Sequence, residues 1–267
     1  MFCKTIPDKQ FIIHEKLSVM ASTSETGHSK NVANMDQLAS FTLGYGPAYN
    51  PSRNSLKTES LVDLSKNAKN AINDVALAFP VYGNAVADRE LSFKPLGILA
   101  TRILNAIKAS DTSSQVIENA KTLIRKIQGR RATPKKTPDQ KKALEAKGIQ
   151  VVEISASQMS FDGRLESFDK LIKLLATLPM YTPNEPELKI DALGALYTNL
   201  RGKNEAVVSA IPPLSNARLM RNNILYNEKT GLVDTAMDAK AYIKSLFGAA
   251  SSQYRQVSGL AFKTLKN

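Results

Sequence analysis

Residues 49–89 read YNPSRNSLKTESLVDLSKNAKNAINDVALAFPVYGNAVADR, and residues 181–221 read YTPNEPELKIDALGALYTNLRGKNEAVVSAIPPLSNARLMR. The two stretches align without a gap at an offset of 132 residues and are identical at 13 of 41 positions. They share the Tyr-x-Pro motif that opens each copy and a proline near the end, at Pro80 and Pro212. Self-similarity at a fixed offset indicates that the chain contains two copies of one structural unit.

Apolar residues in both copies recur at alternating intervals of three and four, which is typical of a helix with one buried face. This spacing predicts a helix from about Leu56 to Arg89, about 50 Å long at ~1.5 Å per residue. We expect a bend or a short break at Pro80 and Pro212, because a proline removes one helical hydrogen bond. We interpret the pair as static bends, with hinges as the alternative. The apolar positions are Leu61, Leu64, Ala68, Ala71, Val75, Ala78, Tyr82 and Ala85, then Leu193, Leu196, Leu200, Val207, Ala210, Leu214 and Ala217.

Shorter amphipathic segments flank each copy, beginning near Val32 and near Leu165 and continuing after each long helix. The sequence therefore predicts an all-α fold of two tandem helical repeats, with about four helices each, that form an elongated bundle. We assign residues 31–128 to the first repeat and 158–263 to the second. Residues 129–157 form a basic, Pro-containing linker, with a weak strand pattern at 149–157. Residues 1–30 are a disordered leader, with translation expected to start at Met20.

Few residues of the catalytic kinds are present: the chain has one cysteine (Cys3) and two histidines (His14 and His28). These residues show no metal-ligand spacing, and the sequence has no phosphate-binding or nucleophile motif. We therefore predict no catalytic, cofactor-binding or metal-binding residue and favour a non-enzyme, with carboxylate or tyrosine catalysis left open. No apolar run is long enough to cross a membrane, and we expect a cytoplasmic protein.

Nearly half of the formal net charge of +12 lies in one place. Residues 129–148 hold seven basic and two acidic side chains. Basic side chains near the linker would make salt-sensitive, sequence-independent contacts with phosphates. A solvated linker that keeps the protein soluble is the alternative. The candidate contacts with nucleic acid are Lys121, Arg125, Lys126, Arg130, Arg131, Lys135, Lys136, Lys141 and Lys142.

Two functions from different classes follow from these patterns. The first is a non-catalytic structural or interaction protein, whose long helices meet a protein partner or a second copy of the chain. The second is a basic, sequence-independent nucleic-acid-binding protein that uses the residues near the linker.

Several motifs, RELSFKPL at 89–96, KIQGRR at 126–131, YTPNEPELK at 181–189 and KAYIKSLFG at 240–248, resemble those of a known protein family. It is a family of internally duplicated, all-helical proteins associated with Bacteroidetes-type genomes. The resemblance covers roughly residues 26–263 and is consistent with a start at Met20. It implies no activity, cofactor or site residue.

Overall fold

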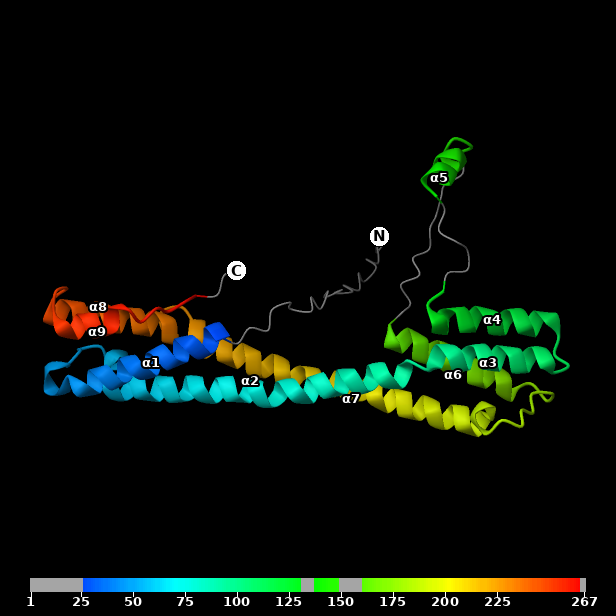
Figure 1. Cartoon of the computed structure of the whole chain (residues 1–267), viewed down its shortest axis with the longest axis horizontal. Coiled ribbons are helices and arrows are strands. Elements are labelled where there is room, and N and C mark those ends of the chain that lie inside the picture. The colour runs from blue at the N-terminus through cyan, green and yellow to red at the C-terminus, as the bar shows by residue number, and fades with distance from the viewer. Residues whose placement is uncertain (1–25, 131–136, 149–159, 265–267) are drawn as a thin grey trace, which may run out of the picture. The chain divides into compact units, whose positions relative to one another are not determined.

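The structure, a computed structural model, describes residues 26–130, 137–148 and 160–264 (Figure 1). All regular elements in these residues are helices, so the all-α prediction is confirmed. The Met20 start and the strand pattern at 149–157 lie outside the described residues. The α-helices are α1 (Thr26–Gly44), α2 (Thr58–Phe93), α3 (Leu96–Ala109), α4 (Ser114–Gln128), α5 (Pro138–Glu145), α6 (Phe161–Ala176), α7 (Ile190–Tyr226), α8 (Leu232–Phe247) and α9 (Ser252–Ser258). Short 3-10 helices are η1 (Gly46–Ala48), η2 (Asn54–Leu56) and η3 (Pro186–Leu188).

The two long helices predicted from the heptad spacing are α2 and α7, and each is preceded by a 3-10 turn. Ahead of each turn, a tyrosine hydroxyl makes the same hydrogen bond to a backbone carbonyl seven residues later. The Tyr49 hydroxyl donates to the Leu56 carbonyl oxygen at 2.8 Å, and the Tyr181 hydroxyl donates to that of Leu188 at 2.9 Å. Both tyrosines are buried, so the Tyr-x-Pro motif anchors the loop that leads into each long helix.

Neither Pro80 nor Pro212 breaks its helix, so the short break that we allowed for is absent at both places. A proline deprives the carbonyl four residues earlier of its hydrogen bond. Here Ala76 and Val208, which carry those carbonyls, are exposed, and so are both prolines. Water can therefore take the place of the missing donor, which allows each helix to continue.

The chain divides into two compact units. One consists of the residues up to 72 together with those from 221 onward, and the other consists of residues 73–220. The boundary falls inside both α2 and α7. The buried apolar residues at one end of each long helix contact a different set of helices from those at the other end. Each unit therefore combines helices from both sequence repeats, a composition that differs from the ranges 31–128 and 158–263.

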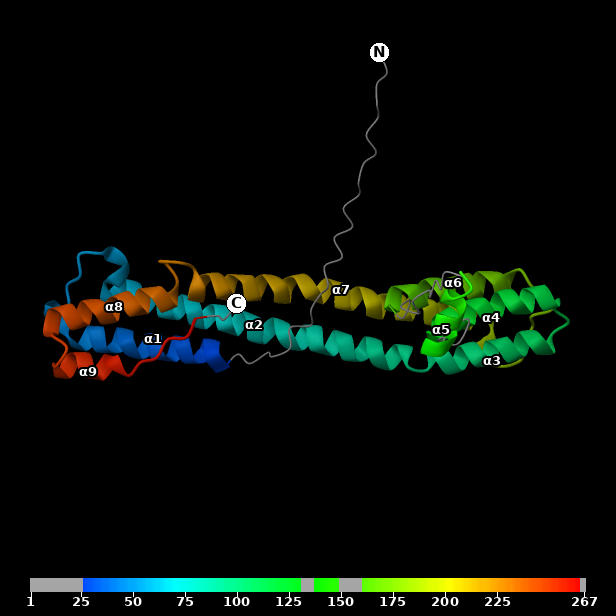
Figure 2. The same cartoon turned by 90° about the horizontal axis from the view of Figure 1, so that it is seen from above.

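In the first unit, α8 packs against α1 and α9 (Figure 2). The chain after α9 lies along α1. The amide of buried Asn31 donates to the Lys263 carbonyl oxygen at 2.8 Å, and the Lys263 N–H donates to the Asn31 Oδ1 at 3.0 Å. The apolar core joins all of these elements and includes Met35, Leu38, Leu61, Leu225, Leu232, Ala236, Ile243 and Val257.

In the second unit, α4 packs against both α3 and α6 (Figure 1). Its core is closed by the end of α2 and the start of α7. Fully buried side chains in it include Phe93, Leu96, Ile103, Ile107, Ile127, Phe168, Leu171, Leu175, Leu193 and Leu200.

Buried positions recur at nearly constant offsets along the chain. Leu61, Ala68 and Val75 of α2 correspond to Leu193, Leu200 and Val207 of α7 at an offset of 132. In α3 and α8 the offset becomes 136: Leu96, Ala100, Ile103 and Ile107 correspond to Leu232, Ala236, Ala239 and Ile243. The connection between α7 and α8 is three residues longer than that between α2 and α3, and α7 is one residue longer than α2, which together account for the four extra residues.

One sequence-based expectation is corrected, and one helix was not foreseen. Residues 26–30, which we expected to be disordered, form the first turns of α1, where His28 Nδ1 lies 2.7 Å from the Tyr226 hydroxyl oxygen. Tertiary contact thus orders a polar segment. The linker contains α5, which begins with a capping box between Thr137 and Gln140 and with Pro138 in its first turn. The T-x-x-Q pattern was a visible helix-start signal that we did not use.

Candidate functional site

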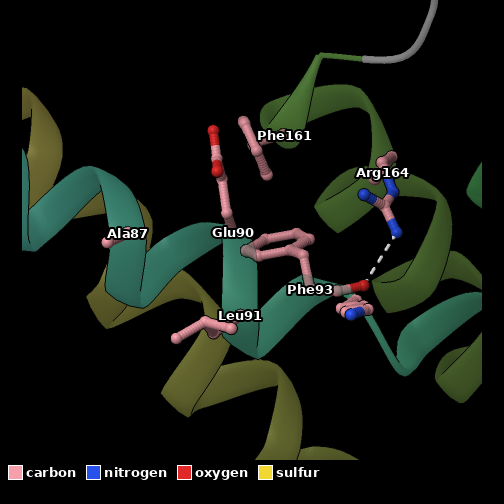
Figure 3. Close-up of a pocket in the computed structure, with 7 residues that line it drawn as sticks. Ala87, Glu90, Leu91, Phe93, Phe161 and Arg164 are labelled. Carbon is pink, nitrogen blue, oxygen red and sulfur yellow. Dashed lines mark hydrogen bonds between the residues drawn. The ribbon is translucent and has the colours of Figure 1, made fainter.

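A pocket of about 640 Å³ lies in the second unit, where the end of α2 approaches the start of α6 (Figure 3). Arg164 is held by backbone oxygens: its Nη2 donates to the Phe93 carbonyl at 3.0 Å and its Nε to that of Ile127 at 3.1 Å. Burial lowers the pKa of Arg164, whose guanidinium lies 5.3 Å from the centre of the Phe93 ring. The lining residues are Ala87, Glu90, Leu91, Phe93, Lys94, Phe161 and Arg164.

A chain of polar contacts beside this pocket joins three helices. Arg89 of α2 donates through Nη1 to the Asn204 Oδ1 of α7 at 3.1 Å, and the Asn204 Nδ2 donates to the Asp162 Oδ1 of α6 at 2.6 Å. The Arg89 guanidinium lies 4.0 Å above the Phe161 ring, and its buried Nε makes no hydrogen bond within the described residues. Asn204 is itself buried, so this chain of contacts fixes the three helices relative to one another.

A second pocket, of about 510 Å³, lies between α3 and the loop that leads to η3. Arg102 of α3 lines this pocket and forms a 2.7 Å salt bridge with Glu187. A backbone hydrogen bond and the bond from Arg102 lower the pKa of Glu187. The Ser110 hydroxyl on the rim donates to the Ile107 carbonyl oxygen at 2.7 Å. The Ser110 hydroxyl proton is therefore bound to a backbone carbonyl oxygen. This hydrogen bond does not activate Ser110 as a nucleophile.

The structure describes six of the nine basic residues that we selected from the sequence, and it places them on or next to two different helices. Lys121, Arg125 and Lys126 lie on α4, Arg130 follows that helix, and Lys141 and Lys142 lie on α5. Arg131, Lys135 and Lys136 lie outside the described residues.

Two of the basic residues on α4 bind to acidic or polar side chains of the same helix. Lys121 forms a salt bridge with Glu118, and Arg125 Nη2 donates to the Thr122 hydroxyl at 2.9 Å. A hydrogen bond from Lys121 is the main cause that lowers the pKa of Glu118. This arrangement reduces the positive field that a phosphate backbone would meet along α4.

The paired long helices contain a stretch without charge that we did not single out from the sequence. Residues 75–87 of α2 and 206–217 of α7 include no Asp, Glu, Lys or Arg. We call these two stretches the neutral belt. The helices run antiparallel here, because Lys203 bonds Asp88 at 2.9 Å while Arg218 lies 6.0 Å from the centre of the Phe79 ring. Charged contacts thus border the belt at both ends.

The neutral belt buries one seam and exposes apolar side chains elsewhere. Val75, Val207 and Leu214 are buried in the seam and belong to neither core cluster of the described chain. Leu77 is 64% exposed and Val81, four residues later on the same side of α2, is 62% exposed. Val208 in the belt is 58% exposed, and Phe79 is exposed as well. Neighbouring exposed apolar residues such as Leu77 and Val81 indicate an interaction surface.

Sequence inspection could have found the neutral belt. The two uncharged runs can be read directly from a chain in which 22% of residues are charged. We missed them because the search followed the buried seam, and only the structure shows that Leu77, Val81 and Val208 stay in solvent. Just past the belt, Leu219 and Met220 are exposed too.

Two negative findings apply to the part of the chain that the structure describes. No group of three or more His, Cys, Asp or Glu side chains in it is arranged to hold a metal ion. No helix in it has the length and apolar content needed to cross a membrane.

Comparison of the chain with protein-family models, with curated proteins and with solved structures gives no match. The family resemblance noted from the sequence motifs therefore stays a prediction.

Proposed function

We propose that this chain is a non-catalytic interaction protein that presents the neutral belt of its paired long helices to a protein partner. The observation that carries the proposal is the exposure of Leu77, Val81 and Val208 in a stretch without charge. A pair of helices buries only one stripe of each, so apolar side chains outside that stripe remain in water until another surface covers them.

The proposal includes an internal duplication, with repeats at residues 31–128 and 158–263. Three observations support it: the 13 identities, the matched hydrogen bonds of Tyr49 and Tyr181, and the recurrence of buried positions. The duplication explains why two long helices of similar length are present to form one pair. The cytoplasmic location stays a prediction.

Affinity capture of the full chain, followed by mass spectrometry, tests the proposed function. The test variant is Leu77→Lys with Val81→Lys, two exposed helical positions where lysine is a good helix former. The matched control is Leu43→Lys with Leu246→Lys, which charges exposed leucines on α1 and α8. We expect partners, other copies of the chain included, to be lost from the test variant alone. Equal capture by all three proteins would contradict a role for the belt.

The alternative function is nucleic-acid binding by the basic residues near the linker. Fluorescence anisotropy with labelled duplex DNA, at salt concentrations from about 50 to 200 mM, tests it. The alternative requires binding at low salt that weakens steeply as salt is added. It also requires that Lys141→Gln with Lys142→Gln reduces that binding. We expect no binding that depends on these lysines.

A further inference from the structure

We infer that the second pocket, between α3 and the loop that leads to η3, binds a small phenol, a molecule with one aromatic ring and a hydroxyl group. The pocket has a volume of about 510 Å³ and shares no residue with the neutral belt. The inference therefore goes beyond the proposed function. Its basis is a comparison between the two compact units.

The residues on the two sides of the pocket have counterparts in the first unit. Tyr49 and Tyr181 correspond at an offset of 132, and each hydroxyl donates to the backbone carbonyl seven residues later. The buried positions of α3 and α8 correspond at an offset of 136. At that offset Ala106, next to buried Ile107, corresponds to Tyr242. The helix beside the loop thus carries a tyrosine in one unit and an alanine in the other.

The two tyrosines of the first unit pack together. The Tyr242 ring meets the Tyr49 ring edge to face, with centroids 5.3 Å apart and an angle of 80° between the planes. In the second unit Ala106 and Tyr181 both line the pocket. Because alanine has no ring, the space beside Tyr181 stays open. The pocket is therefore the counterpart of a place that the first unit fills with a phenol side chain of its own.

A salt bridge holds the loop to its helix in both units. Arg102 of α3 forms one with Glu187, and Arg53 of the first unit forms one with Asp238 of α8. Arg102 and Asp238 correspond at the offset of 136, so the same helix position is used with opposite charge. Since each loop is attached to its helix in this way, the exchange of tyrosine for alanine accounts for the open space.

The size of the pocket suits one aromatic ring with a substituent. A cavity of about 150 Å³ can hold benzene, and ligand pockets typically measure roughly 300–1,000 Å³. A volume of about 510 Å³ accommodates the ring and leaves room for polar groups. The ring then meets Tyr181 edge to face, an arrangement that aromatic pairs prefer.

Asn105 supplies hydrogen-bonding groups beside the open space. It lines the pocket and corresponds to Ala241 in the first unit. Its side-chain amide makes no hydrogen bond to another described residue, so its carbonyl oxygen and its N–H groups are available to a ligand hydroxyl. The second unit thus has Asn-Ala where the first has Ala-Tyr, which removes a ring and adds an amide next to the space. A phenol matches both changes.

Titration of the isotope-labelled full chain with p-cresol, the side-chain analogue of tyrosine, tests the inference by amide-resolved NMR. We expect shifts of amides in α3 and in residues 180–188. A single ring makes few contacts, so we expect a dissociation constant on the order of 1 mM. The saturated analogue methylcyclohexanol should bind at least about 3-fold more weakly, because it lacks the aromatic edge.

Two variants test the comparison between the units. Ala106→Tyr should fill the space as Tyr242 does and weaken p-cresol binding by at least about 10-fold. Ile98→Tyr is the matched control, because it adds a tyrosine at an exposed position of α3 outside the pocket, and it should leave binding unchanged. Tyr242→Ala should open the corresponding space in the first unit, so that p-cresol also shifts amides of α8. Circular dichroism verifies that the helices of each variant are intact.

Several results would overturn the inference. They are the absence of shifts up to about 10 mM p-cresol, equal binding of methylcyclohexanol, and binding that Ala106→Tyr leaves intact. If Ala106→Tyr did not fold, Tyr242→Ala would decide, and the absence of new shifts in α8 would count against the inference. None of these results bears on the neutral belt, which the capture experiment tests separately.

Discussion

Replacement of Tyr181 by phenylalanine removes a single buried oxygen atom and leaves the apolar ring in place. The hydroxyl donates to the Leu188 carbonyl oxygen at 2.9 Å, and both residues are almost fully buried. A typical net hydrogen bond contributes about 0.5–1.5 kcal/mol, and an unpaired buried acceptor costs about 1–3 kcal/mol. We expect Tyr181→Phe to lower the free energy of unfolding by about 1.5 kcal/mol.

Tyr49 offers an internal repetition of the experiment. Its hydroxyl donates to the Leu56 carbonyl oxygen at 2.8 Å from an equally buried position. If the two loops are copies of one design, Tyr49→Phe should cost the same as Tyr181→Phe to within about 0.5 kcal/mol. Because the substitutions lie in different compact units, the costs should add in the double variant.

Urea unfolding followed by circular dichroism measures these costs as shifts of the midpoint at an unchanged slope. Tyr197→Phe is the control, since the hydroxyl of this partly buried tyrosine makes no hydrogen bond within the described residues. We expect its effect to stay below about 0.5 kcal/mol. An equal loss in the control, or no measurable loss at Tyr181 and Tyr49, would refute the assignment of these hydrogen bonds as anchors.

Three other predictions concern stability. Pro80→Ala should stabilise the chain by about 1–3 kcal/mol, because it restores a helical hydrogen bond at an exposed site. Thermal or urea unfolding measures this change. A loss of stability would show that the proline positions the helix. Gly231→Ala should cost about 1–3 kcal/mol, because its Cβ would lie 2.6 Å from the backbone four residues earlier. Gly83→Ala, whose Cβ meets nothing, is the matched control and should stabilise α2 by up to about 1 kcal/mol. Burial raises the pKa of Tyr181 to about 12 and raises that of Tyr49, so these tyrosines ionise more readily in the unfolded chain. Stability should therefore be constant below about pH 10 and fall as the pH rises toward about 12, with a smaller fall in Tyr181→Phe, as urea midpoints at several pH values would show.

The candidate pockets illustrate what sequence patterns did not reveal. Arg89 was named only as the end of a predicted helix, and Asp162 and Asn204 carried no signal at all. They lie 42 or more residues apart in the chain, and their contact depends on how α2, α6 and α7 pack. The series of hydrogen bonds that joins these helices could not be deduced from the spacing of residues along one helix.

By itself, the sequence determined the helical nature of the chain, the register of the buried seams and the repeated Tyr-x-Pro motif ahead of each long helix. These features are local or repeat at a fixed offset, and the heptad spacing and the 13 identities express them directly. The tertiary structure alone decided how the compact units are composed: each takes part of α2 and part of α7. It also decided that Leu77, Val81 and Val208 stay in water. The reason is physical, since a helix has several faces and only packing against particular neighbours selects which of its apolar side chains become buried.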